Sequence, residues 1–263
     1  MLRNWLTRAC LCSLFVVAPF GAAGAADLPL KTPLPAPPVP PAVSWTGCNL
    51  NGGYGYGLWN QVQHTEVDGT QTSIDVTNGG RGWLGRLGVG CDYQMGGGFS
   101  SWVIGVLGEY DFMGLKGTNE FSANPPGALG INRAGEEKET GAWYVGGHIG
   151  YLVTPNLMTY FDGGWTQTRF DQVNYGLTGS PGPTGESLPA TTYQGWFLGG
   201  GTEYALNFDW LPIRGLFWRN EYRFASYQAK DVAVMNAATP GAEEHLRKYV
   251  QTVTSSLIWR FNW

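Results

Sequence analysis

Nine charged side chains stand at alternating positions within stretches that are otherwise apolar or rich in glycine. Glu109 and Asp111 form one such pair, and Glu221 is flanked at the same spacing by Arg219 and Arg223. Because successive side chains of a β-strand point to opposite faces, residues two apart share a face. We expect these groups to pair, since an isolated buried charge carries a large desolvation penalty. The predicted network comprises Arg86, Glu109, Asp111, Asp162, Glu203, Arg219, Glu221, Arg223 and Arg260.

His148 is predicted to project toward the same face as these charges, where an imidazole could ligate a haem or a metal ion. The other histidines, His64 and His245, fall in predicted loops, and no Cys or Asp cluster joins them at ligand spacing. We therefore interpret His148 as a hydrogen-bonded histidine of the interior. No metal and no cofactor is predicted.

Catalysis finds little support among the remaining polar residues. Ser255 and Ser256 have no sequence-adjacent base, and no Ser/His/acid arrangement can be assembled from the sequence. The stretch "GRGWLG" from Gly80 to Gly85 matches a G-x-G-x-x-G pattern. It precedes a predicted strand and opens no helix, so the dinucleotide-binding interpretation fails on context. We predict that the chain is not an enzyme.

The charged residues lie in eight segments whose hydrophobicity alternates and which turn-like stretches separate, without sustained helical periodicity. The last segment contains "LIWRFNW", with large aromatics at every second position, Trp259, Phe261 and Trp263. Such a face needs a large apolar partner. In the first segment, "CNLNGGYGYGL", the apolar face carries Cys48, Leu50, Tyr54, Tyr56 and Leu58.

The apolar partner of these faces could be a protein core or a lipid bilayer, and the composition helps to decide between the two. The 263 residues include 40 Gly, 12 Trp, 13 Tyr and 12 Phe, and only 14% are charged. The polar faces of the segments are rich in Gly, and the apolar faces carry Trp and Tyr near segment ends. This pattern is typical of a transmembrane barrel with aromatic girdles and a narrow polar lumen. The alternative is a secreted β-sandwich.

We therefore predict an all-β fold, an eight-stranded antiparallel up-and-down transmembrane β-barrel over 45–263. Short periplasmic turns are expected near "QMGGGFS", "VTPN" and "LNFDWLP". Long loops, at roughly 60–81, 113–140, 171–192 and 229–246, are expected to face outward. Side chains mostly fill an eight-stranded lumen, so the charge network is predicted to be a plug, and a selective pore lining is the alternative.

The N-terminal residues read as an export signal. An apolar run follows Arg3 and Arg8 and ends in the small residues 23–25, which predicts a cleaved secretory signal over 1–25 that also removes Cys10 and Cys12. Without the two arginines, 14 basic residues remain against 20 acidic ones, a net charge of −6 that disfavours a nucleic-acid partner.

Residues 26–44 contain "LPLKTPLPAPPVPPAV", which favours extended polyproline geometry. We interpret this segment as a periplasmic linker. The alternative is a binding segment for a periplasmic partner.

Cys48 and Cys91 are predicted to form a disulfide. If they oppose each other on neighbouring antiparallel strands, Tyr56 opposes Trp83, which is a self-consistent register. Facing residues have Cβ atoms about 4.5–5.5 Å apart, close enough for a bridge with modest adjustment. The periplasm is oxidising. Two free thiols are the alternative.

The motifs "ADLP", "WTGCNLNGGYGYG", "GVGCDYQ", "WVIGVLGEYDF" and "GTEYALN" resemble the Omp25/Omp31-like outer-membrane β-barrel family of alphaproteobacteria. The resemblance covers nearly the whole mature chain, although only the strands carry it. It implies an eight-stranded barrel that is an abundant surface protein of the envelope. Trp263 resembles the C-terminal aromatic signal that the outer-membrane assembly machinery recognises, with Trp259 and Phe261 before it. The long, weakly patterned loops depart from the family.

These observations predict a structural, surface-exposed barrel of the cell outer membrane with a mostly plugged lumen. Its expected partners are outer-membrane lipid and the outer-membrane assembly machinery. Two alternatives stay open at this point. Some members of the resembled family are described as porins or hemin binders, so the chain could be a narrow porin for small solutes or a hemin-binding surface protein that uses its loops.

Overall fold

A computed structural model describes residues 43–96, 101–122, 132–177, 183–207 and 214–261. The predicted signal over 1–25 and nearly all of the predicted linker over 26–44 lie outside these ranges. No helix among the described residues has the length and the apolar character needed to cross a membrane.

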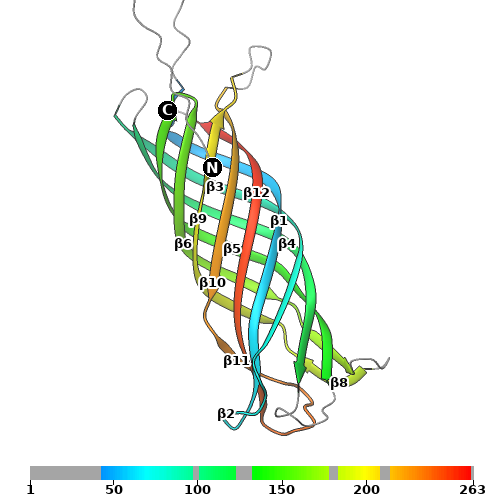
Figure 1. The fold of residues 1–263 in the computed structure, drawn as a ribbon. Helices are drawn as coiled ribbons and strands as arrows, with labels where there is room; N and C mark the ends of the chain where they lie inside the picture. The colour runs from blue at the N-terminus through cyan, green and yellow to red at the C-terminus, as the bar shows by residue number, and fades with distance from the viewer. Residues whose placement is uncertain (1–42, 97–100, 123–131, 178–182, 208–213, 262–263) are drawn as a thin grey trace, which may run out of the picture. The chain divides into compact units, whose positions relative to one another are not determined.

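Eight long strands form a closed antiparallel ring (Figure 1). Each strand pairs with its neighbours in the chain, and the first strand pairs with the last along its whole length, which closes the sheet. No edge of this ring is left unpaired, as hydrocarbon requires. The strands are β1 (Gly47–Val67), β3 (Val76–Met95), β4 (Trp102–Ser122), β5 (Asn132–Thr154), β6 (Leu157–Phe170), β9 (Thr191–Ala205), β10 (Leu216–Tyr227) and β12 (Ala242–Phe261).

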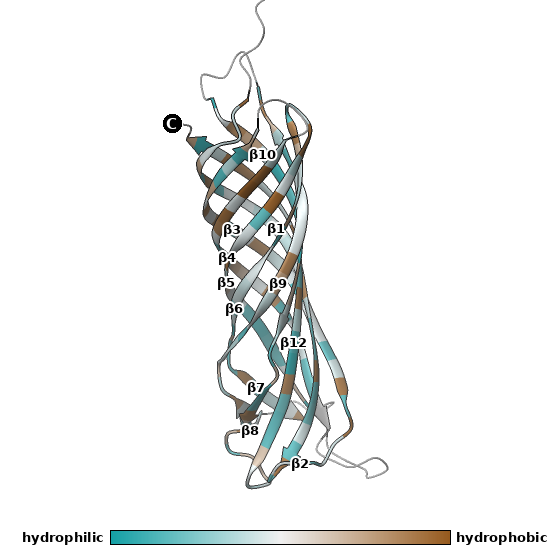
Figure 2. Ribbon diagram, turned by 90° about the vertical axis from the view of Figure 1, so that its left-hand side faces the viewer, coloured by the Kyte–Doolittle hydropathy of each residue, from teal (hydrophilic) through white to brown (hydrophobic). Residues whose placement is uncertain are grey.

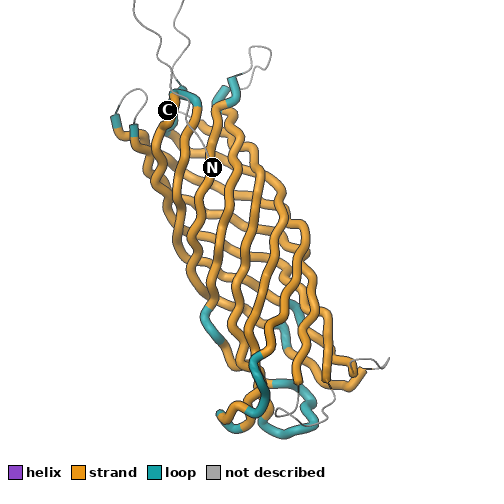
Figure 3. The backbone as a smooth tube through the Cα atoms, in the orientation of Figure 1, coloured by secondary structure: helices purple, strands orange, loops and turns teal. Residues whose placement is uncertain are grey.

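The two ends of the barrel differ in their connections (Figures 1 and 3). At the end that we call the turn end, where Cys48 pairs with Phe261, β5 and β6 are joined by only two residues. At the opposite end, the loop end, the connections contain four short strands, β2 (Thr70–Gln71), β7 (Val173–Leu177), β8 (Pro183–Leu188) and β11 (Lys230–Ala233).

Large hydrophobic residues are exposed on the half of the barrel nearer the turn end. Figure 2 shows that the loop-end half is more hydrophilic. Phe161 is 75% exposed, Trp83 69% and Tyr54 67%. A soluble protein rarely exposes so extensive an apolar belt, whereas a membrane-spanning barrel presents one to the hydrocarbon of the bilayer. The belt also includes Leu50, Leu87, Val89, Val106, Phe112, Trp143, Val145, Ile149, Trp196, Leu198, Val253, Leu257 and Trp259.

The predicted boundaries are wrong for the first two long loops, 60–81 and 113–140, whereas the loop predicted at 171–192 agrees with the end of β6 and the start of β9. β1 continues to Val67 and β3 begins at Val76, inside the predicted loop 60–81, and β4 and β5 likewise extend far into 113–140. The reason is that the outer face of these extensions is mostly polar, although Met113 and Leu115 of β4 still point inward and are buried. In β1, Gln61 and Gln63 point inward and His64 points outward, so the backbone keeps its pairing after the apolar alternation has stopped.

Successive layers of side chains fill the barrel interior, and β10 alone displays them. Phe217 belongs to an apolar layer at the turn end, Arg219 to Arg223 carry the charges of the middle, and Ala225 and Tyr227 join an apolar layer toward the loop end. This alternation of layers places charged groups between two apolar layers.

Candidate functional site: the charged lumen

All nine residues of the predicted network point into the barrel, and each is at most 6% exposed. These nine residues and His148 of β5, which lies beside them, form what we call the middle layer. They come from seven of the eight strands of the ring. The eighth strand, β1, contributes Asn49, whose amide donates to Asp92 Oδ2 at 3.0 Å.

Glu109 on β4 is the centre of the network. Its Oε2 lies 2.9 Å from Arg223 Nη1 and 3.4 Å from Arg86 Nη1, while its Oε1 lies 3.2 Å from Arg219 Nη1. Three guanidinium groups therefore share one carboxylate that has 1% exposure. Two of these arginines come from β10, which faces β4 across the lumen.

On the side of the network nearer the loop end, Arg86 binds Asp111 through two bonds, from Nε at 2.7 Å and from Nη2 at 2.8 Å. Such bidentate pairs are the strongest and most directional ion pairs in proteins. Glu221 accepts a hydrogen bond from Tyr160 Oη at 2.8 Å and also contacts Arg86 and Arg223. The planar Arg223 group lies over the Phe197 ring at 4.7 Å, which joins the charges to the aromatic layer above them.

On the side nearer the turn end, Arg260 Nη2 bridges Asp92 Oδ2 at 2.7 Å and Glu203 Oε1 at 2.8 Å. His148 Nε2 lies 2.9 Å from the other oxygen of Asp92. Asp92 is a member of the network that the predicted set omitted, although strand alternation placed it on the inward face with Arg86. Near the loop end of the network, Arg223 Nη2 lies 2.7 Å from Asp162.

Glycine makes room for these side chains. A Cβ added to Gly105 would lie 2.2 Å from Asp92 Oδ1 and 2.5 Å from His148 Cε1. A Cβ on Gly199 would lie 2.3 Å from Asp162 Oδ1. All three separations are too short for a real Cβ atom, so a side chain at either position would have to displace the charged group of the adjacent strand. At these two positions glycine therefore accommodates the polar group of a neighbouring strand.

A second polar layer lies closer to the loop end and was not predicted. Lys248 on β12 is fully buried and places Nζ 2.6 Å from Glu137 Oε1, and it also contacts Gln61. Asn119 donates to the other oxygen of Glu137 at 3.0 Å. Sequence reasoning missed this layer because Glu137 was assigned to a loop. The spacing of Glu137 and Glu139 was the available signal.

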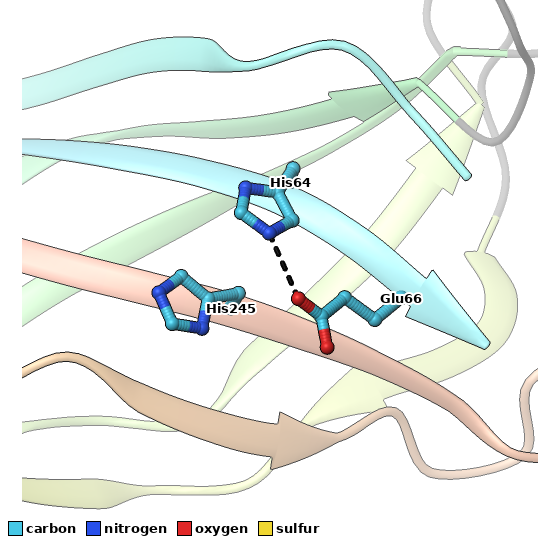
Figure 4. Close-up of side chains that lie close together, drawn as sticks. All are labelled: His64, Glu66 and His245. Carbon is cyan, nitrogen blue, oxygen red and sulfur yellow. Dashed lines mark hydrogen bonds and ion pairs between the residues drawn. The ribbon is translucent and has the colours of Figure 1, made fainter. Parts of the chain in front are cut away.

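The assignment of His64 and His245 to loops is also wrong. They lie on β1 and β12 and oppose each other directly in the register of the two strands. Their rings stack at a centroid distance of 4.8 Å, and Glu66 approaches His64 (Figure 4). No local pattern could reveal this pairing, because the two strands are joined only by closure of the ring.

The disulfide between Cys48 and Cys91 is confirmed, and the two cysteines are paired in the β1–β3 register as expected. Tyr56 opposes Trp83 in the same register, with ring centroids 5.3 Å apart. At the end of β12, Trp259 is 47% exposed, and the centroid of its ring lies 4.3 Å from that of Phe261. Trp263 lies outside the described residues.

The chemistry of the middle layer is mutual neutralisation. Four guanidinium groups face six carboxylates, with His148 beside one of the six, and almost every charged group has a partner of opposite sign within 3.4 Å. The charges are directed at one another across the lumen. Ion pairs such as Glu109–Arg223 and Glu109–Arg219 join strands on opposite sides of the lumen.

A closed ring of eight antiparallel strands, with an apolar belt outside and a polar, side-chain-filled interior, defines a transmembrane β-barrel of the outer-membrane class. The protein is 32% identical over 203 residues to the 31 kDa outer-membrane immunogenic protein of Brucella melitensis biotype 1, a match that covers 71% of this chain and 75% of the relative. The protein of that name from Brucella suis biovar 1 matches to the same extent. The chain belongs to this family. It is an outer-membrane surface and structural barrel protein.

No protein-family model matches the chain. Among solved structures, OprG from Pseudomonas aeruginosa aligns with a TM-score of 0.45 at 10% identity, covering 82% of this chain and 98% of that one. Neisserial surface protein A aligns with a TM-score of 0.31 at 11% identity, covering 79% of this chain and 97% of that one.

Proposed function

We propose that the lumen of this outer-membrane barrel is closed to solutes and that the protein serves the envelope as a structural, surface-exposed element. The contact between Glu109 and Arg223 carries the proposal, because it joins β4 to β10, which lie on opposite sides of the eight-stranded ring. The lining of an open channel stays in contact with water. Both of these side chains are 1% exposed.

The turn end of the lumen has its own closure. Trp45, just before β1, is fully buried inside the ring and donates from Nε1 to the Pro155 carbonyl at 3.2 Å. Its indole lies 4.9 Å from the Phe217 ring and 5.3 Å from the Arg260 guanidinium. A solute that entered from the periplasm would meet this aromatic group first.

Closure toward the loop end comes from Lys248. Its ammonium lies 4.0 Å from the centre of the Phe170 ring and is held by Glu137. A buried ammonium with carboxylate and aromatic partners is a fixed obstruction, because any displacement would expose unpaired charge in a low-dielectric interior. Three successive obstructions therefore support a closed lumen.

A catalytic role is not part of the proposal. Ser255 lies on the outer surface, where its hydroxyl accepts a hydrogen bond from Trp218 Nε1 at 2.7 Å. Ser256 points inward and is 4% exposed. Alternation on one strand thus separates the two serines, and neither is paired with a histidine in the contacts described above.

The partners that fit this proposal follow from the two halves of the outer surface. Outer-membrane lipid would surround the apolar belt, and the loop end would face outward. The outer-membrane assembly machinery would insert the barrel. A periplasmic partner for the Pro-rich segment 26–44 stays a prediction.

Ion conductance in a planar bilayer tests the closed lumen. Folded insertion is established independently, by heat-modifiable mobility on gels and by protection from protease. We expect no discrete conductance steps from the wild type, and none from Trp45→Ala, because the middle layer remains. Reproducible steps from the wild type would overturn the proposal and favour the narrow porin. Steps from Trp45→Ala alone would place the closure at the turn-end mouth and contradict the role given to the network.

A further inference from the structure

An unassigned group of imidazoles and carboxylates lies on the outer surface of the barrel at the loop end. His64, Glu66 and His245 each offer one ligand atom, and these atoms all lie within 4.8 Å of one another (Figure 4). The side chains are partly exposed and point away from the lumen. This group is therefore separate from the charged interior described above.

We propose that His64, Glu66 and His245 form a binding site for a divalent transition-metal ion of the zinc class. Two imidazoles and one carboxylate are a common protein ligand set for such ions, which favour nitrogen donors more strongly than magnesium or calcium does. His64 Nε2 and Glu66 Oε1 are 3.0 Å apart, close to the separation of about 3.4 Å expected for two ligands of a tetrahedral zinc ion.

The carboxylates around the two histidines support this assignment. Asp75 Oδ1 lies 3.0 Å from His64 Nδ1, on the far side of the ring from the nitrogen that faces Glu66. A carboxylate in this position fixes the imidazole tautomer that presents Nε2 to a metal. His64 thus has both the ligand partner and the outer-shell partner that metal-binding histidines usually have.

His245 has a carboxylate partner as well. Asp231 on β11 pairs with His245 in the strand register, and its Oδ1 lies 2.5 Å from His245 Nδ1. Glu243 opposes Glu66 in the β1–β12 register and adds a further negative charge. Three carboxylates therefore contact the two imidazoles and a fourth lies opposite Glu66 in the register, a balance of charge that favours a cation. Arg247, exposed two residues from His245, is the nearest positive charge along the same strand.

Metal binding requires only a local adjustment. The two rings now stack with an interplanar angle of 13°, so one imidazole must turn to direct its nitrogen at a shared ion. Partial exposure leaves space for this rotation, whereas the backbone is fixed by the direct pairing of His64 with His245. The site is thus preformed in its backbone and adjustable in its side chains.

The position of the site suggests what a bound ion would do. β1 and β12 are the first and last strands of the ring, and their pairing is the one that closes the barrel. An ion held by His64 and His245 would link the two closing strands outside the membrane. Because the unfolded chain lacks this arrangement, the ion would stabilise the closed barrel.

Calorimetric titration with ZnCl₂ tests the site on untagged, folded protein in a chelator-free detergent solution. We expect one ion per barrel, with affinity weakened at least tenfold in His64→Ala and in His245→Ala and about tenfold in Asp75→Asn. Glu136→Gln is the matched control, because it removes an exposed carboxylate of β5 that pairs with Lys116. The zinc affinity of Glu136→Gln should equal that of the wild type.

Two further measurements keep the test decisive if a histidine variant folds poorly. Cu²⁺ bound to the wild type should show electron-spin coupling to two imidazole nitrogens, a signature that phosphate groups of bound lipid cannot give. Zinc should also raise the temperature at which the folded band is lost on gels in the wild type but not in Glu66→Gln. Unchanged zinc binding in a folded His64→Ala/His245→Ala protein, or no stoichiometric binding to the wild type, would overturn the proposal.

Discussion

Glu109 Oε2 and Arg223 Nη1 lie 2.9 Å apart although their strands, β4 and β10, stand opposite each other in the ring. Three strands intervene between them in either direction around the barrel. The sheet hydrogen bonds hold each strand only to its neighbours, whereas this ion pair joins two opposite strands directly across the lumen. Its removal should therefore affect the whole barrel more than the loss of a pair between neighbouring strands.

Glu109→Gln should destabilise the folded barrel by about 3–5 kcal/mol, the usual cost of breaking a buried ion pair from one side. The amide keeps the shape of the carboxylate but leaves Arg86, Arg219 and Arg223 with one negative charge fewer. Urea unfolding in lipid vesicles, followed by tryptophan fluorescence, measures the change.

The control for this variant is Glu136→Gln, which breaks an exposed pair with Lys116 at 2.9 Å. Exposed ion pairs contribute at most about 1 kcal/mol. If the two variants have the same free energy of unfolding, the middle layer has no structural role in the barrel.

Gly105→Ala should destabilise the barrel by about 1–3 kcal/mol, as overpacking in a close-packed interior does. The new methyl group would occupy the space of the Asp92 carboxylate and the His148 ring. Gly108→Ala on the same strand is the matched control, since a Cβ at that position meets no atom within 4 Å. Thermal loss of the folded gel band compares the two. Equal stability would mean that the interior can shift to accept the methyl group.

The Cys48–Cys91 bridge should stabilise the barrel by up to about 4 kcal/mol, given the chain-entropy value for a separation of 43 residues. The paired β1 and β3 strands already restrict that loop, so the measured loss in Cys48→Ser/Cys91→Ser should be smaller. Urea unfolding of this variant against the wild type gives the value. Alkylation of non-reduced native protein should leave its mass unchanged, and any labelled cysteine among the two would contradict the bridge.

Strand alternation could predict the interior of the belt region because lipid and lumen impose opposite chemistry on the two faces. Trp83 and Leu87 are exposed on the outer face, whereas Arg86 between them is buried, and this contrast is visible in the sequence itself. The pairing of Cys48 with Cys91 could be predicted from the same alternation, because facing residues on neighbouring antiparallel strands lie close enough for a disulfide.

Beyond the belt, the outer face meets water and is mostly polar, and the interior holds both polar and apolar layers, so the contrast between the two faces disappears. Lys248 meets Glu137 from across the ring, and His64 meets His245 through the pairing of the first strand with the last. Each contact joins residues more than a hundred positions apart. Neither composition nor local periodicity specifies such a pair, so it becomes visible only after the ring is closed.

The pH dependence of stability should include a contribution from Glu244, which is fully buried at the loop end beyond the lipid belt. Burial raises the pKa of this carboxyl to about 7, although a hydrogen bond from Thr65 Oγ1 at 2.7 Å acts in the opposite direction. The folded state therefore holds a proton that the unfolded chain releases near pH 4.5. A raised acid pKa stabilises the folded form at low pH, and this contribution declines as the pH rises from about 4.5 to 7.

Glu244→Gln removes that titration, so its free energy of unfolding should fall less than that of the wild type over the same pH range, by up to about 3 kcal/mol. Some slope should remain, because burial also raises the pKa of Glu139 at the loop end, to about 8. Urea unfolding at several pH values between 4.5 and 8 measures the difference. The neighbouring Glu243→Gln is the control, since Glu243 is exposed and its removal should leave the slope close to that of the wild type. Identical slopes in the wild type and Glu244→Gln would show that Glu244 is ionised in the folded barrel, and that its proton has no part in the acid stability of the loop end.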